Sequence, residues 1–405
     1  MPTHHHGRDR TRRRPLHRVA LACAVTALLT ALPACGADRA GDDGAAADGG
    51  RSRDAAAAAH RESAEGFTLV ATGDILAHDS IIQQARRDAG GKGYDFRPML
   101  AAAEPLVSAA DLAVCHMETV YGADGGPFTG YPAFQTPPHV AEAIAATGYD
   151  SCSTASNHTL DAGPDGVRRT LDALDEAGVR HVGSARSAKE DAEPVLLDAG
   201  DAKVAQLAYT YGTNGIPVPD GKPWLVDLLD PRKVVADARA ARKAGADVVV
   251  VSVHWGTEWQ QEPDTDQLRL AKELTASRSD GRRDIDLILG THNHVPQAYE
   301  KVNGTWVVYG LGDQVAGVMN DPRGSMGSAA RFTFAPPRRE GGEWRVRKAD
   351  FTPFLMASEP RFRLVDLTGE EARGSGRPQY TAALNGIREA VLARGAADDG
   401  LTMTR

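Results

Sequence analysis

The chain has 405 residues, of which 42% are hydrophobic and 25% are charged, and this composition is typical of a folded protein of enzyme size. It argues against disorder throughout the chain and against a membrane protein with many spans. The 54 acidic residues outnumber the 46 lysines and arginines and give a net charge of −8, which argues against a general nucleic-acid binder.

The first 34 residues differ from the rest and predict a lipoprotein-type signal peptide. Six arginines stand within residues 1–18, and an uncharged run, residues 19–34, follows them. This run is shorter than the roughly 20 residues that a membrane-spanning helix needs. Residues 32–35, Leu-Pro-Ala-Cys, resemble a bacterial lipobox, which makes Cys35 the expected site of lipidation. The alternatives are an uncleaved anchor and an ordinary signal peptide, which would leave the protein secreted.

Residues 35–66 are rich in Ala, Gly, Asp, Arg and Ser and show no apolar periodicity, so we expect a flexible tether there. The folded domain is expected to span residues 67–360, held outside the cytoplasm on the membrane by the lipid. An extension, residues 361–405, is expected to follow with one helix at 381–393.

The body of the chain alternates short runs of β-forming residues with segments of helical periodicity. The clearest run is the continuous β-branched segment 247–253, which predicts a buried central strand. Such alternation predicts an α/β architecture with a mixed or largely parallel core. In chain order the expected strands are 67–72, 111–115, 149–154, 179–182, 204–209, 247–253, 285–289 and 306–309, and the expected helices include 165–177, 231–244 and 266–277.

Carboxylate, amide and imidazole side chains follow nearly every expected strand, where functional groups of open α/β sheets collect. Oxygen and nitrogen donors of this kind suit a divalent Mn, Fe or Zn ion. Taken singly they have ordinary interpretations, such as a helix cap for an aspartate or an Asx-turn for an asparagine. The sharpest signal is His292 with His294, because alternate residues at a strand end can point both rings at one ion. The full set is Asp74, Glu118, Asn157, His158, His254, His292 and His294.

Five sequence blocks in this order resemble the CapA-like capsule or poly-γ-glutamate synthesis family, a branch of the calcineurin-like metallophosphoesterases. A sixth block is similar to the closing Leu-Gly-Asn block of that family, and the resemblance covers about residues 67–320. The five blocks are 71–75 (ATGDI), 111–119 (DLAVCHMET), 156–161 (SNHTLD), 254–258 (HWGTE) and 290–297 (GTHNHVPQ), and the sixth is 309–313 (YGLGD).

The resemblance implies a four-layer α-β-β-α sandwich of the calcineurin-like metallophosphoesterase type with a centre for two divalent ions. It implies a hydrolase in which a metal-bound hydroxide attacks a phosphoester or an anionic envelope polymer, with Glu118 bridging the ions and His158 as the catalytic group. The alternative is a non-catalytic lipoprotein that binds the polymer or assembles a capsule-export complex. The implied metal ligands are Asp74, Glu118, Asn157, His254, His292 and His294.

Four further residues are expected to surround these ligands, and the sequence departs from the family pattern at three positions nearby. Leu76 stands where the superfamily has a histidine, and His78 follows two residues later as a candidate substitute. His116 replaces an asparagine, Asp313 replaces another, and Glu258 is expected to orient His254.

Other residues near the blocks have two interpretations each. Trp255 and Trp259 either stack on a substrate or, as we favour, pack their loop. Residues 122–137 are expected either to cover the site or to form an ordinary surface loop. Cys115 and Cys152 lie on strands that are neighbours in the family fold, which permits a disulfide, whereas two buried free thiols are the favoured alternative.

Overall fold

The computed structural model describes residues 66–339 and 341–404, which belong to one compact unit. The expected signal peptide, the lipidation site Cys35 and the tether lie outside the described residues. Within the described residues, none of the helices combines the length and the apolar character needed to cross a membrane.

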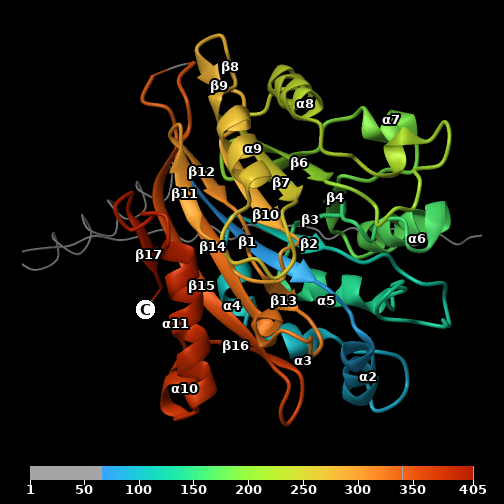
Figure 1. The fold of residues 1–405 in the computed structure, drawn as a ribbon. Helices are drawn as coiled ribbons and strands as arrows, with labels where there is room; N and C mark the ends of the chain where they lie inside the picture. Colours follow the sequence, from blue (N-terminus) through green and yellow to red (C-terminus); the bar gives the residue numbers. More distant parts are fainter. Residues whose placement is uncertain (1–65, 340, 405) are drawn as a thin grey trace, which may run out of the picture. The chain divides into compact units, whose positions relative to one another are not determined.

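The larger sheet contains both parallel and antiparallel strands, in the order β16-β15-β14-β1-β2-β3-β4 (Figure 1). Strands β1 to β4 run parallel to one another, whereas the pairs β1-β14, β14-β15 and β15-β16 are antiparallel. Strand β13 pairs with β1 and β17 with β15. The bounds are β1 Phe67–Ile75, β2 Leu112–Met117, β3 Ser151–Ser153, β4 Arg180–Val182, β13 Asp313–Val315, β14 Met326–Ala335, β15 Arg345–Ala357, β16 Arg363–Asp366 and β17 Leu401–Met403.

The second sheet has the order β11-β12-β10-β7-β6-β5, and its four central strands are parallel. The run expected at 247–253 is its fully buried strand β7. A short hairpin, β8 Arg278–Ser279 with β9 Arg282–Arg283, stands apart from both sheets. The bounds are β5 Leu196–Ala199, β6 Ala202–Thr210, β7 Val248–His254, β10 Leu287–Thr291, β11 Tyr299–Val302 and β12 Thr305–Val308.

The helices end where the local sequence provides a stop or a cap. Helix α5 ends at Gly148, which adopts the left-handed conformation with φ of 100°. Helix α9 begins with a capping box between Asp264 and Gln267. The bounds are α2 Asp79–Asp88, α3 Arg97–Leu100, α4 Glu104–Val107, α5 His139–Thr147, α6 Gly163–Glu176, α7 Ala188–Asp191, α8 Pro231–Lys243, α9 Thr265–Ala276, α10 Glu370–Gly374 and α11 Pro378–Leu392.

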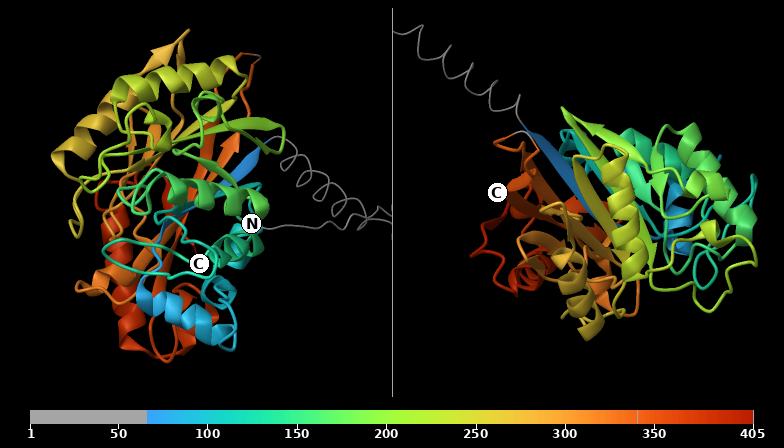
Figure 2. Two further views of the ribbon diagram at one scale, coloured as in Figure 1. Left: turned by 90° about the vertical axis from the view of Figure 1, so that its right-hand side faces the viewer. Right: turned by 90° about the horizontal axis from the view of Figure 1, so that it is seen from above.

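The fold consists of four layers (Figure 2), and the packing of the apolar side chains shows which elements face one another. Alternate residues of a strand face opposite sides of its sheet. Leu69 of β1 accordingly packs in the core between the sheets, and Val70 packs against the helices α2 to α6. On the second sheet Val250 faces the same inter-sheet core, and Val249 packs against α8 and α9. The four-layer α-β-β-α sandwich expected from the resemblance is therefore confirmed.

The main difference from the expected elements lies after residue 309, beyond the last strand expected from the sequence. Two long strands, β14 and β15, follow and join the larger sheet. Residues 361–404, expected as an extension with one helix, add the strands β16 and β17 to that sheet. Ile387 of α11 also packs into the inter-sheet core.

The two cysteines of the domain are joined by a disulfide. Cys115 of β2 and Cys152 of β3 are register partners on adjacent parallel strands, with their Cα atoms 4.5 Å apart. The expectation of two free thiols is therefore wrong, because the strand pairing brings the two side chains into bonding range.

Candidate metal centre

The carboxyl ends of four parallel strands meet at one edge of the sandwich and bring the candidate ligands together. Asp74 of β1 is the register partner of both His116 on β2 and Asp313 on β13. His254 ends β7 opposite Thr291, the last residue of β10. The eight side chains that gather here are at most 6% exposed: Asp74, His116, Glu118, Asn157, His158, His254, His292 and His294.

One half of the centre is built around His294. Its Nδ1 lies 3.0 Å from Oδ1 of Asp313 and 3.7 Å from Oδ2 of Asp74, and its Nε2 lies 3.8 Å from Oε1 of Glu118. Asp313 therefore holds the ring, whereas the atoms of Asp74 and Glu118 stand too far away for a hydrogen bond. A ligand atom each from Asp74, Glu118 and His294 lies within 4.8 Å of the others, which is close enough to hold one ion.

The other half is built around His254. Its Nε2 lies 2.9 Å from Oδ1 of Asn157 and 3.8 Å from Oε1 of Glu118, so Glu118 stands between the two halves. The ring of His292 lies 4.7 Å from that of His254. Asn157 donates from Nδ2 to Oδ1 of Asn214 at 3.1 Å, which directs its carbonyl oxygen toward His254.

The expected orienting role of Glu258 on His254 is wrong. Thr291 Oγ1 lies 3.0 Å from Nδ1 of His254, and Asn157 occupies Nε2, so both ring nitrogens already have partners. Glu258 is exposed and instead lies near His292 and His294.

His116 lies inside the centre, closer than an outer position implies. Ser153 Oγ lies 2.7 Å from Nδ1 of His116, and the opposite nitrogen, Nε2, lies 3.8 Å from Oδ1 of Asp74. The ring stacks on His254 with centroids 4.8 Å apart. His78, by contrast, uses its Nδ1 to accept a hydrogen bond from the Gly317 N–H.

Several buried oxygen and nitrogen atoms of the side chains at this centre have no hydrogen-bond partner among the described residues. Buried polar atoms without partners are rare, because each costs the free energy of its lost hydration. Here they cluster, and all belong to carboxylates and imidazoles, which are the ligands of divalent Mn, Fe and Zn ions. The residues present therefore fit a divalent metal centre. The atoms are Oδ1 of Asp74, Nε2 of His116, both carboxylate oxygens of Glu118, Nδ1 of His292 and Oδ2 of Asp313.

Burial disfavours the charged forms of the groups at this centre and shifts their pKa values accordingly. It raises the pKa of Asp74 to about 8 and the pKa of Glu118 well above its usual value. It lowers the pKa of His116 and of His292 to about 3. Burial also works to lower the pKa of His294, but the surrounding carboxylates, Asp313 foremost, outweigh it and raise that pKa well above the usual value.

The turn after β10 holds two candidate ligands in a strained backbone conformation. His292 has a φ of 94° and His294 a φ of 54°, and residues other than glycine rarely adopt positive values. The two rings are 6.1 Å apart and face the two halves of the centre. The histidines thus lie in a turn beyond the strand rather than at alternate positions of its end. Such strain typically marks a functional site.

His158 faces a cavity of about 340 Å³ next to the centre. Its Nδ1 lies 2.7 Å from Oδ2 of Asp161, which also accepts a hydrogen bond from the Phe134 N–H. Phe134 places its ring edge-on to His158, and Tyr131 is 72% exposed at the same cavity. The loop 122–137 therefore borders the site, which was one of its two expected roles.

Of the two tryptophans, Trp255 is buried and donates from Nε1 to the Tyr309 carbonyl, so it packs the fold. Trp259 lines the cavity, with its ring 5.4 Å from that of His294.

The sequence left several supporting residues unassigned. They are polar side chains that hold the rings and amides of the candidate ligands. Asp161 had a usable signal, since it stands three residues after His158 in a block already singled out. The others contact ligands far away in the chain and had none: Ser153, Asn214 and Thr291.

Comparison with known proteins gives a consistent family signal. The family model described as "Bacterial capsule synthesis protein PGA_cap" matches residues 68–318. The capsule biosynthesis protein CapA of Bacillus anthracis is 29% identical over 43% of this chain and 42% of its own length. A probable polyglutamine synthesis accessory protein of Mycobacterium tuberculosis is 28% identical over 51% of this chain and 56% of its own. The chain thus spans about half the length of these curated relatives.

Two solved structures have a distant likeness to the fold. A 5′-nucleotidase precursor from Thermus thermophilus has a TM-score of 0.44 and 18% identity, covering 81% of this chain and 59% of its own. The calcineurin-like phosphoesterase YfkN from Bacillus subtilis has a TM-score of 0.41 and 14% identity, covering 80% of this chain and 99% of its own. Both likenesses are too distant to inform function.

Proposed function

Because the chain belongs to the bacterial capsule synthesis protein family, we propose that it is a metal-dependent hydrolase of the cell envelope that acts on a phosphoester or an anionic polymer. The observation that carries the proposal is the cluster of buried carboxylate and imidazole atoms that have no hydrogen-bond partner in the described part of the chain. Divalent cations would satisfy many of these acceptor atoms at once.

Two sets of residues would hold two ions. Asp74, His294 and His116 would hold the first, and Asn157, His254 and His292 the second, with Glu118 between them. Two divalent ions supply charge neutralisation for a phosphoryl group and lower the pKa of a bound water. Asp313, Ser153 and Thr291 hold the rings of three of the histidines in place.

His158 is suited to move a proton or to stabilise charge on the substrate. Asp161 holds its Nδ1, which leaves Nε2 as the atom that would donate to a leaving oxygen in the cavity. Phe134 covers one side of the ring and limits the access of water. We propose that a lipid attached to Cys35 anchors the protein and keeps this site at the outer surface of the membrane.

The proposal is tested on protein produced from Gly36, purified without chelator, by metal analysis and by hydrolysis of phosphomonoesters and phosphodiesters. We expect two divalent ions per chain and measurable turnover. His158→Ala should lower kcat by about 10²- to 10⁴-fold and leave the metal content unchanged, because this residue holds no ion. Full metal content without turnover of any phosphoester or envelope polymer would instead favour the polymer-binding or assembly role, and protein without metal would overturn the centre itself.

Metal binding at pH 7 should release protons. The pKa of Asp74 is raised to about 8 in the metal-free protein, so its carboxyl carries a proton at pH 7 that a cation must displace. Affinity for the metal should therefore fall as the pH is lowered from 8. Calorimetric titration in buffers of different ionisation enthalpy measures the proton release, and Asp74→Asn should release fewer protons than the native chain. Binding heats that are the same in all buffers would contradict the prediction.

A further inference from the structure

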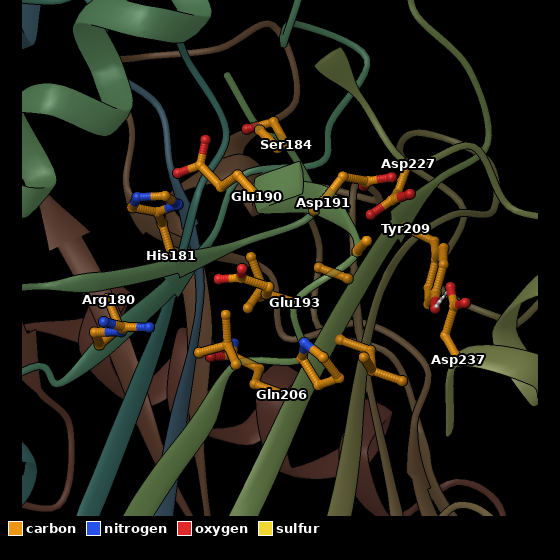
Figure 3. Close-up of a pocket in the computed structure, with 18 of the residues that line it drawn as sticks. Arg180, His181, Ser184, Glu190, Asp191, Glu193, Gln206, Tyr209, Asp227 and Asp237 are labelled. Atoms are coloured by element: carbon orange, nitrogen blue, oxygen red, sulfur yellow. Dashed lines mark hydrogen bonds between the residues drawn. The ribbon is translucent and has the colours of Figure 1, made fainter. Parts of the chain in front are cut away.

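A second pocket, of about 460 Å³, lies at the edge of the second sheet and shares no lining residue with the cavity beside His158 (Figure 3). Its walls come from β4 and the loop that follows, from α7, from β6 and from α8. Its volume is within the range typical of small-ligand sites.

One wall is a short free stretch of sheet edge. Strand β5 pairs with β6 only as far as Ala205, and the Gln206 N–H still donates to the Val195 carbonyl at 3.3 Å. The next backbone bond on this edge is from the Thr210 N–H to the Asp227 carbonyl at 2.9 Å. Among the described residues, no strand lies beside residues 207–209 on this edge, and all three line the pocket. A free edge of this kind accepts an extended peptide through backbone hydrogen bonds.

The side chain of Gln206 is the second feature of this wall. It is 1% exposed and lines the pocket, yet neither its Oε1 nor its Nε2 has a hydrogen-bond partner among the described residues. A buried amide without partners is costly. Its adjacent donor and acceptor match those of another amide, which could satisfy both.

The third feature is an excess of negative charge. Six carboxylates line the pocket against three lysine or arginine side chains. Arg186 already binds Asp172, Asp175 and Glu190, and Lys233 binds Asp227 and Asp237, so these cations are not free for an anionic ligand.

Asp191 has no ion-pair or hydrogen-bond partner for its carboxylate among the described residues, and it lies beside Asp227 in the pocket (Figure 3). Burial raises its pKa, so an approaching cation would stabilise its charged form. An ammonium group suits this position, because the described residues whose ligand atoms converge within 4.8 Å, as a metal site needs, all belong to the centre around Glu118.

We propose that this pocket binds the amino end of a peptide-like chain. The terminal ammonium would face Asp191, the backbone would extend along residues 207–209 of β6, and an amide further along the chain would pair with the side chain of Gln206. The free edge is bounded by Val195 on one side and by Asp227 on the other, so it suits a chain end rather than a strand that runs through. This site goes beyond the proposed hydrolase and requires no metal.

The test is calorimetric titration of the metal-free full chain with triglycine, with N-acetyl-triglycine and with glucosamine. We expect triglycine to bind at least about tenfold more tightly than its acetylated form, because acetylation removes the charged hydrogen bond to Asp191. Equal affinity for the two peptides, or no binding of triglycine at millimolar concentration, would overturn the proposal. Preferential binding of glucosamine would overturn it in favour of a saccharide site.

Two variants locate the binding. Asp191→Asn lies at an exposed position and should weaken triglycine binding about tenfold while leaving the affinity for N-acetyl-triglycine unchanged. Gln206→Met keeps the size of the side chain and should weaken both peptides. The matched control is Asp201→Asn, an exposed acid outside the pocket in the turn between β5 and β6, which should bind as the native chain does. Native affinity for triglycine in Asp191→Asn would overturn the site even if Gln206→Met does not fold.

Discussion

Replacing Glu118 by glutamine should abolish tight metal binding and, at the same time, make the metal-free protein more stable. The carboxylate lies between the two halves of the centre, 3.8 Å from ring nitrogens of both His254 and His294. Its loss should therefore weaken both ions, by at least about 100-fold, since even the loss of an outer partner of a ligand costs 10- to 100-fold.

The buried carboxylate of Glu118 also accounts for the expected gain in stability of the metal-free variant. Both oxygens of Glu118 are buried and have no hydrogen-bond partner within residues 66–339 and 341–404, and burial raises the pKa of this carboxyl well above the usual value. A carboxyl group whose pKa is raised on folding stabilises the fold below its unfolded pKa and loses that contribution as the pH rises through the folded value. The neutral amide should thus raise the free energy of unfolding by about 1–3 kcal/mol at pH 8 and have little effect near pH 4.

The measurements are metal analysis after dialysis, and denaturant unfolding in the presence of chelator at the two pH values. Glu262→Gln, an exposed acid that follows the same strand as His254, is the matched control and should change neither quantity. A Glu118→Gln protein that keeps two ions, or that is less stable than the native chain without metal, would contradict the assigned position of this side chain.

Replacing His116 by asparagine should remove one of the two ions. Ser153 holds Nδ1 of His116, and the buried Nε2 faces Oδ1 of Asp74, which also lacks a partner. This is the usual arrangement of a metal-bound histidine, whose second nitrogen is held by a neighbouring group. We therefore expect affinity for one ion to fall by more than the roughly 10- to 100-fold cost of losing an outer partner, and affinity for the other ion to change little.

Metal stoichiometry and the absorption spectrum of the cobalt-loaded protein measure this effect independently of turnover. His181→Asn, a buried histidine remote from the centre, is the control and should keep both ions. Leu76 lines the same cavity as His294, so Leu76→His in the His116→Asn background supplies a new imidazole near Asp74 and should restore part of the lost affinity. Retention of both ions with native affinity in His116→Asn would show that this residue is not a ligand.

The fold class could be predicted because its signal is local. Strand β7 is a continuous β-branched run, and α9 carries its apolar residues and its cap within one short segment. The strands that were missed lack such signals. Strand β14 contains Gly-Ser-Ala-Ala at 327–330, and β15 opens with basic residues and includes Pro353, so both form only because neighbouring strands pair with them.

The candidate ligands could be proposed from their positions directly after strands, but their partners could not. Whether Asp313 caps a turn or holds His294 depends on the pairing of β13 with β1. Whether His78 or His116 faces Asp74 depends on the register between β1 and β2. Neither register has a local signature in the chain.

By itself, the sequence determined the α/β alternation up to about residue 309 and the residue types that follow each expected strand, because periodicity and residue chemistry are properties of short segments. The tertiary structure alone decided which atoms meet, such as those of His116 with Asp74 and of Cys115 with Cys152. It also decided where β5 stops pairing with β6, which is just before Gln206. Those contacts depend on strand register and on where a neighbouring strand stops, and both are set by packing across the whole sandwich rather than by any one segment.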